Sequence, residues 1–312
     1  MPSDKNTRVS IIIPVYNSER SIGALVTRLV NELGSRFVPE IILVNDQSAD
    51  QSDKACIALF EQYPGIVKYY PLAKNVGEHN AVMAGLNQMS GDYAVIMDDD
   101  FQNPVSEVLK LISYATDNEF DVVYTWYEKK EHSWWRNLGS RFNNRIANIM
   151  LNKPRDLYLS SFKLLNRYLV NEIIQYDLPF PYIDGLILRT TSNIGKIQVM
   201  HHHREDGRSN YTLKKLVRLW MNMFTNFSIL PLRVAIIMGF LFAMIGIVLG
   251  IWTVIEKINN PNLPLGYASI IVAISVFSGT QLIAIGMLGE YLGRMFLSQN
   301  KKPQYSIRKR FE

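Results

Sequence analysis

The chain contains one cysteine, Cys56, among its 312 residues, so no disulfide can form within it. Such sparing use of cysteine suits a protein that stays in a reducing compartment. Two nucleotide-binding signatures are also missing: no G-x-G-x-x-G follows the first apolar run, and no G-x-x-x-x-G-K-S/T occurs anywhere. Dinucleotide binding of the Rossmann type and phosphate binding by a P-loop are therefore disfavoured.

Formal charges are absent from residues 234–255 and again from residues 268–289. An α-helix needs about 20 residues to cross a bilayer, which is close to the length of each stretch. Buried helices of a soluble protein are the alternative, but the short Asn/Pro-rich loop at residues 259–266 joins the two stretches and favours a membrane hairpin. No signal peptide is expected, because the apolar run at residues 9–15 is short and Pro14 interrupts it.

Basic residues flank these apolar stretches unevenly. The connecting loop offers only Lys257, whereas lysines and arginines cluster before the first stretch and after the second. The positive-inside rule then places both chain ends in the cytoplasm and predicts a two-span protein of the cytoplasmic membrane. We expect the formal net charge of +5 to meet anionic membrane lipids rather than nucleic acid. The flanking bases are Lys214, Lys215, Arg218, Arg233, Arg294, Lys301, Lys302, Arg308, Lys309 and Arg310.

The first two-thirds of the chain alternates short β-branched runs with amphipathic stretches of helical spacing. This order predicts an α/β fold, with a mostly parallel sheet and helices on both faces. The strands are expected at residues 9–15, 40–45, 67–72, 93–97 and 121–126, and the helices at residues 22–33, 51–62 and 78–89.

Four segments follow from these patterns. A cytoplasmic α/β domain is expected at residues 1–212, and within it the Trp- and Arg-bearing residues 134–151 predict an interfacial helix at headgroup depth. An ordinary surface helix is the alternative there. An amphipathic juxtamembrane helix is expected at residues 213–232, two transmembrane helices at residues 233–290 and a basic cytoplasmic tail at residues 291–312.

Three carboxylates, Asp98, Asp99 and Asp100, follow the fourth predicted strand. Alternate side chains on a strand share a face, so Asp98 and Asp100 are expected to point the same way at the carboxyl edge of the sheet, where open parallel sheets bind ligands. Two carboxylates suit Mg²⁺ or Mn²⁺, whose shells substrate phosphates complete, and a diphosphate ligand is therefore expected. A solvated acidic turn is the alternative for an isolated D-x-D.

Polar loops also follow the first two predicted strands, Tyr16-Asn17-Ser18-Glu19 and Asn45-Asp46-Gln47-Ser48. An aromatic ring beside carboxylates and amides can hold a nucleotide base. His79 begins a helix just after Gly77, where a helix N-terminus favours anions, and a capping or packing role for this histidine is equally open.

Five motifs occur in an order that, with the paired apolar stretches, resembles family 2 glycosyltransferases of GT-A fold. More closely, the chain resembles the polyprenyl-phosphate glycosyltransferases, relatives of dolichol-phosphate mannose synthase that include the undecaprenyl-phosphate formamidoarabinose transferases. The motifs are Ile12-Ile13-Pro14-Val15-Tyr16-Asn17, Leu43-Val44-Asn45-Asp46, Asn75-Val76-Gly77-Glu78-His79-Asn80-Ala81, Asp98-Asp99-Asp100-Phe101-Gln102-Asn103-Pro104 and Arg204-Glu205-Asp206-Gly207-Arg208-Ser209.

The resemblance implies inverting transfer of a sugar from a nucleotide sugar, typically a UDP-sugar, to polyprenyl phosphate at the cytoplasmic face of a bacterial membrane. It makes Asp98, Asp100 and Arg204 the catalytic residues, and it gives the Mg²⁺ or Mn²⁺ site to Asp98, Asp100 and Gln102. The residues implied for the nucleotide sugar are Pro14, Tyr16, Asn17, Glu19, Asp46, Gly77, His79, Asp98 and Asp99. Those implied for the acceptor phosphate are Arg136, Ser140, Lys130 and Ser209.

The chain also departs from the family pattern. Ser18 stands where an acid usually follows Tyr-Asn, and Glu19 comes next. Tyr127 occupies the place of an acceptor-binding arginine, which leaves Lys129 or Lys130 as the candidate for that contact.

Two other functions are weighed against transfer to a lipid. A membrane-anchored nucleotide-sugar binder or scaffold without catalysis is the main alternative. A processive polysaccharide synthase is disfavoured, because no Q-x-x-R-W motif is present and two spans hardly form a translocation channel. The sequence leaves open the sugar and whether the chain forms a homo-oligomer.

Overall fold

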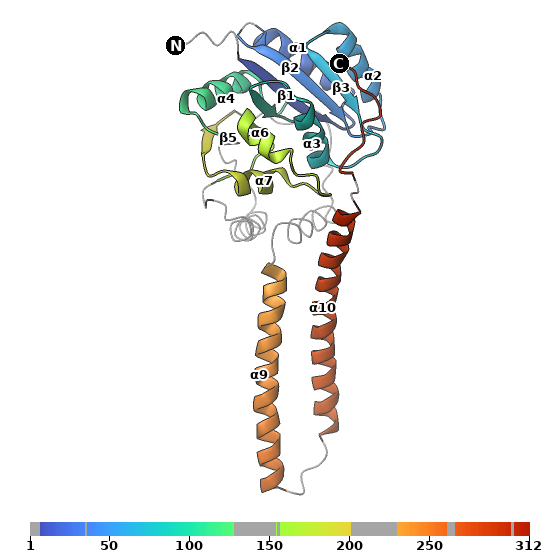
Figure 1. Cartoon of the computed structure of the whole chain (residues 1–312), viewed down its shortest axis with the longest axis vertical. Helices are drawn as coiled ribbons and strands as arrows, with labels where there is room; N and C mark the ends of the chain where they lie inside the picture. The colour runs from blue at the N-terminus through green and yellow to red at the C-terminus, as the bar shows by residue number, and fades with distance from the viewer. Residues whose placement is uncertain are drawn as a thin grey trace. The chain divides into compact units, whose positions relative to one another are not determined.

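The computed structural model describes residues 7–34, 36–127, 154, 157–200, 230–260, 266–300 and 303–312 (Figure 1). The chain divides into two compact units, one of Met1–Tyr211 with Lys301–Glu312 and one of Thr212–Asn300. The predicted interfacial helix at residues 134–151 and most of the predicted juxtamembrane helix lie outside the described residues. The boundaries predicted for these segments stay a prediction.

The strands of the first unit are β1 (Arg8–Val15), β2 (Val38–Asn45), β3 (Val67–Pro71), β4 (Tyr93–Ile96), β5 (Val122–Trp126), β6 (Lys163–Asn166) and β7 (Ile194–Gln198). They form one seven-stranded sheet in the order β3-β2-β1-β4-β6-β5-β7. β6 runs antiparallel to its neighbours β4 and β5, and every other pair is parallel. The predicted mostly parallel sheet is confirmed.

The helices in the described part of this unit are α1 (Ile22–Leu33), α2 (Ser52–Gln62), α3 (Glu78–Gln88), α4 (Val105–Asn118), α6 (Arg167–Ile173) and α7 (Ile183–Thr190). α1, α2 and α4 share one hydrophobic cluster with the sheet. α3 packs on the opposite face, where its Gly85 meets Ile12 of β1 and Val44 of β2. Helices on both faces, as predicted, therefore cover the central strands.

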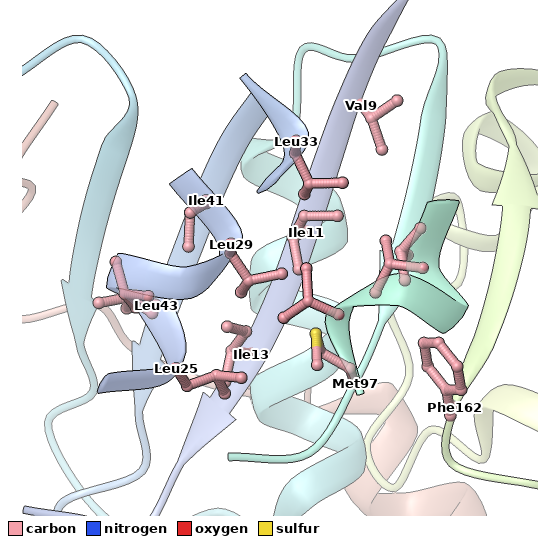
Figure 2. Close-up of a cluster of buried hydrophobic side chains, with 14 of the residues drawn as sticks. Val9, Ile11, Ile13, Leu25, Leu29, Leu33, Ile41, Leu43, Met97 and Phe162 are labelled. Carbon is pink, nitrogen blue, oxygen red and sulfur yellow. The ribbon is translucent and has the colours of Figure 1, made fainter. Parts of the chain in front are cut away.

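The core forms because β1 is apolar on both faces, which is typical of a central parallel strand. Its residues Ile11 and Ile13 are fully buried and lie against the α1 residues Leu25 and Leu29 (Figure 2). The four-residue spacing of these leucines puts them on one side of α1. Burying each such side chain contributes about 1.5–3 kcal/mol, so β1 is a rigid base for the loop that follows it.

The described residues of the second unit form two long helices, α9 (Leu230–Asn259) and α10 (Tyr267–Gln299). Within the described residues, one helix, at Leu232–Asn259, is long and apolar enough to cross a membrane by length and composition, with a mean hydropathy of 2.8. α10 covers the second predicted stretch and continues to Gln299, past the predicted end at residue 290. The second span stays a prediction.

The last residues of the chain belong to the first unit. Residues 303–312, which belong to the predicted basic tail, lie along the free edge of β3 (Figure 1). Isolated antiparallel bridges join Tyr69 to Phe311 and Leu72 to Ile307. An unpaired sheet edge exposes backbone donors and acceptors, and the tail satisfies part of that edge.

Packing of α3 on the sheet gives a stability prediction. A Cβ at Gly85 would lie 2.5 Å from Cγ2 of Ile12, a buried β-branched residue whose methyl group cannot move freely. We expect Gly85→Ala to lower the free energy of unfolding by about 1–3 kcal/mol, measured by urea denaturation of the full chain in detergent.

Gly23 of α1 is the matched control, because, apart from the adjoining backbone of α1 itself, no atom lies within 4 Å of its Cβ position. Alanine at this helical position should raise stability by about 0.5–1 kcal/mol. Equal effects of the two substitutions would contradict close packing of Gly85 on Ile12.

Candidate active site

Three loops meet where β1, β2 and β4 end together, since the strands are parallel neighbours. Each loop contains a non-glycine residue with positive φ: Asn17 at 56°, Gln47 at 53° and Phe101 at 59°. Left-handed backbone is unfavourable for most such residues and concentrates at functional sites. The strain at this edge marks it as the candidate site.

Asp99 connects the loops that follow β1 and β4. Its Oδ2 accepts a hydrogen bond from the backbone N of Tyr16 at 3.1 Å and another from the hydroxyl of Ser18. The carboxylate lies in a concave part of the surface, where desolvation, partly offset by these hydrogen bonds, raises its pKa to about 6. Ser18, which replaces the usual acid of the family pattern, is therefore a neutral partner for Asp99.

Asp98 and Asp100 lie beyond the strand, because β4 ends at Ile96. The sequence-based argument relied on strand alternation to orient these two side chains. Because they lie outside the strand, hydrogen bonds orient them instead. Oγ of Ser161 donates to Oδ2 of Asp98 at 2.6 Å, and the backbone N of Gln102 donates to Oδ1 of Asp100 at 3.2 Å.

A metal can fit these residues only with help from a substrate. Among the described residues, no three His, Cys, Asp or Glu side chains converge closely enough to hold an ion. Mg²⁺ and Mn²⁺ are commonly bound by one or two carboxylates plus substrate phosphates, and the carboxylates of Asp98 and Asp100 match that chemistry. The side-chain role predicted for Gln102 stays a prediction.

Asp46, at the end of β2, is buried and accepts two backbone hydrogen bonds. The N–H groups of Val76 and Gly77 donate to its Oδ1 and Oδ2 at 2.7 and 2.8 Å. Burial outweighs these bonds and raises its pKa above the ordinary value. An ionised carboxylate has about four acceptor positions, so Asp46 can fix the loop before α3 and still accept from a base N–H.

An open cavity of about 860 Å³ lies between α1 and the loops after β1, β2 and β4. It includes four of the residues predicted from the sequence, namely Asn17, Glu19, Asp99 and Asp100. Tyr16 lies beside it on the same loop and is 43% exposed, so its ring is free to pack on a planar base.

Asn17 and Glu19 fasten the first loop to the second. Oδ1 of Asn17 accepts from the backbone N of Ala49 at 2.8 Å, and its own N donates to Oγ of Ser48 at 3.0 Å. Oε2 of Glu19 accepts from the N of Gln51 at 2.8 Å. Both side chains therefore shape the cavity, and this structural role is independent of their predicted role in binding the nucleotide sugar.

His79 lies in the first turn of α3, beside Gly77. Its ring meets Tyr182 edge-on at 5.2 Å between centroids, and desolvation lowers its pKa to about 4. The imidazole is therefore neutral near pH 7 and offers an anion a hydrogen bond rather than a positive charge.

Sequence reasoning missed a buried polar network that joins β5, β6 and α7. Lys163 of β6 forms an ion pair with Asp184 of α7, and Tyr124 of β5 donates to the same carboxylate at 2.8 Å. Charged residues inside apolar elements are the signal that could have found this pair, because such groups are rarely buried unless paired. Tyr127, where an acceptor-binding arginine was expected, donates to Oδ1 of Asn103 at 3.1 Å and so braces the loop after β4.

The remaining predicted residues are placed only in part. Pro14 lies in β1 directly before this edge. Those that fall outside the described residues are Lys130, Arg136, Ser140, Arg204 and Ser209.

Comparison with known families identifies the class of protein. Residues 10–174 match glycosyl transferase family 2, and residues 230–295 match the GtrB C-terminal hairpin. The chain belongs to glycosyl transferase family 2 and is therefore a glycosyltransferase, as the motifs predicted.

Curated relatives cover nearly the whole chain. The chain is 32% identical over 305 residues to the undecaprenyl-phosphate 4-deoxy-4-formamido-L-arabinose transferase of Serratia proteamaculans, which covers 97% of this chain and 93% of that protein. It is likewise 32% identical over 310 residues to the enzyme of the same name from Yersinia enterocolitica, covering 98% and 94%.

A solved structure supports the fold. Glucosyl-3-phosphoglycerate synthase from Mycobacterium tuberculosis, crystallised with Mn²⁺, UDP-glucose and phosphoglyceric acid, superposes with a TM-score of 0.51 at 18% identity. The match covers 70% of this chain and 80% of that chain. The predicted GT-A type of fold is confirmed.

The carboxylates after β4 give a catalytic prediction. Asp98→Asn and Asp100→Asn keep the size of the side chain but remove the charge that a hard cation needs. We expect each to lower sugar transfer by about 10²–10³-fold in a lipid-extraction assay, while the protein stays in the membrane fraction.

Asp92 is the matched control, because it precedes β4 and binds the backbone N of Arg8 at the opposite edge of the sheet. Asp92→Asn should retain transfer. Full activity in the Asp98 or Asp100 variant would contradict the metal assignment.

Proposed function

We propose that this glycosyltransferase moves a sugar from a nucleotide sugar, with UDP as the expected nucleotide, to undecaprenyl phosphate or a similar polyprenyl phosphate, with inversion at the anomeric carbon. The observation that carries the proposal is that Asp98 and Asp100 lie at the strained sheet edge, beside an open cavity, in a chain that continues into an apolar helical hairpin. The names of the curated relatives agree with this lipid acceptor.

The acceptor needs little activation by the protein. A phosphate monoester has a second pKa of about 6, so polyprenyl phosphate is largely ionised near pH 7 and can attack the anomeric carbon without a general base. The chain must instead stabilise the departing nucleoside diphosphate. The basic residues Arg136 and Arg204, implicated by the family resemblance, would offset repulsion between the two anionic reactants.

Asp98 and Asp100 would hold the cation, and the resemblance adds Gln102 to that set. When bound, Mg²⁺ or Mn²⁺ supplies charge neutralisation to the diphosphate that leaves. Ser161 keeps Asp98 oriented, and Asp99 keeps the loop of Tyr16 closed against the triplet. Tyr16 and Asp46 would bind the base by ring packing and by accepting an N–H.

The proposed location is the cytoplasmic membrane of a bacterium, with two spans and both chain ends in the cytoplasm. α9 follows the catalytic unit in the sequence, and the tail after α10 packs on β3 of the same unit. If the hairpin crosses the bilayer twice, both of its ends must lie on the side of the catalytic unit. The basic flanks favour the cytoplasmic side.

A non-catalytic nucleotide-sugar binder, the alternative weighed from the sequence, is disfavoured by membership of glycosyl transferase family 2. The cavity and the Asp46 loop would serve such a protein equally well. The orientation of Asp98 by Ser161 favours the enzyme, because a binder has no need of a precisely held carboxylate at the diphosphate.

The test is radiolabel transfer by purified full-length protein in detergent, with undecaprenyl phosphate and a panel of UDP-, GDP- and dTDP-sugars. We expect one donor to give a lipid-extractable product with Mg²⁺ or Mn²⁺. Chelation of the metal by EDTA should lower the transfer rate at least 100-fold, on the order of the loss of a charge-stabilising group. Comparison of the two metals then identifies the better cofactor. Metal-dependent binding of a donor without product would instead establish the binder.

A further inference from the structure

The C-terminal segment, residues 303–312, contains none of the catalytic motifs and pairs with β3 and the loop that follows it. Backbone N and O of Phe311 bond to O and N of Tyr69 at 3.1 and 2.9 Å. The N of Arg308 donates to O of Pro71 at 2.8 Å. The segment therefore acts as an added antiparallel strand at the edge of β3.

Side chains fix the segment as firmly as its backbone does. The ring of Phe311 lies 5.6 Å from that of Phe60 in α2 and 5.4 Å from that of Tyr69, and it packs against the main hydrophobic cluster. At the start of the segment, Nε2 of Gln304 donates to O of Tyr176 at 2.6 Å and to O of Leu178 at 2.9 Å. The segment therefore spans from the end of α6 to α2.

One path of contacts leads from Phe311 to the open cavity beside the loop after β1. Tyr69, which packs on Phe311, accepts a hydrogen bond from Nδ2 of Asn45 at 3.0 Å. Oδ1 of Asn45 accepts from Oγ of Ser48 at 2.7 Å, and that Oγ accepts from N of Asn17 at 3.0 Å. Asn17 lines the cavity.

A second path runs through the loop after β3. The N of Ala73 donates to O of Ser306 at 2.8 Å, and its O accepts from Nη2 of Arg308 at 3.5 Å. The same loop continues to the two amides that bind Asp46. Both loops that would contact the base are therefore braced from the C-terminal segment.

We propose that residues 303–312 are a strap that positions the loops of the donor nucleotide, with Phe311 and Arg308 as its positioning residues. The inference rests on the proposed function, and it adds a part of the chain beyond the two family matches, which end at residues 174 and 295. The strap follows α10 after residues 300–302, so the apolar hairpin continues directly into it.

The test compares the full chain with a variant that ends at residue 302, using the donor found in the transfer assay. A positioning role predicts that KM for the donor rises about tenfold, while KM for undecaprenyl phosphate and kcat stay within about twofold. A synthetic peptide of residues 303–312 should restore the donor KM in a saturable way, and a scrambled peptide should not. An unchanged donor KM, or a loss confined to kcat, would overturn the strap.

Point variants guard against simple misfolding. Phe311→Ala removes the ring contacts and should raise the donor KM several-fold, on the order of a lost aromatic contact of about 1 kcal/mol, with Phe311→Leu in between. Ser306→Ala is the matched control, because Ser306 contributes its backbone O to Ala73. Equal donor KM values for Phe311→Ala and Ser306→Ala would count against the proposal.

A binding measurement separates failure of the proposed function from failure of the strap proposal. If the full chain transferred no sugar from any donor, calorimetric titration with UDP and Mn²⁺ would still compare the full and truncated chains. Weaker UDP binding after truncation would support the strap, and equal binding would reject it.

Discussion

Repulsion between neighbouring carboxylates is the constraint on which this site depends. Asp98, Asp99 and Asp100 are consecutive, and a site for a diphosphate brings still more negative charge to them. The structure separates their tasks by hydrogen bonding: Asp99 is satisfied by the loop of Tyr16 and Ser18, and Asp98 is held by Ser161. Such an arrangement needs a rigid base, which the largely buried strands β1 and β4 provide. Packing of the core thus stabilises a loop in which three neighbouring carboxylates repel one another.

Much of the fold was predictable because its signals are local. Buried parallel strands read as continuous apolar runs, and α1 matches its predicted limits, residues 22–33, since its apolar spacing is unbroken and Gly34 follows it. α4, β6, α6 and α7 were not predicted. Lys163 opens β6 and Asp184 lies inside α7, and these charges interrupt the apolar pattern until the fold brings them together.

The site was predictable in its location but not in its contacts. Parallel topology puts the ends of β1, β2 and β4 at one edge, so the loops of Tyr16, Asp46 and Asp98 had to meet. Which oxygen binds which group depends on partners far apart in the sequence. Val76 for Asp46 and Ser161 for Asp98 are separated from them by 30 and 63 positions, and no periodicity encodes such pairs. The contact of Phe311 with Tyr69 joins residues still farther apart in the sequence, and it was equally unpredictable from local patterns.

Pairing of β3 with the end of the chain also has a consequence for biosynthesis. A ribosome makes the rest of the α/β domain before residues 303–312, which are added only after both apolar helices have been translated. During that interval the edge of β3 has no cover from its final partner, and an open edge is a template for pairing with other chains. Shielding of the nascent domain, by a chaperone or by prompt delivery to the insertion machinery, is therefore a requirement that the topology itself creates.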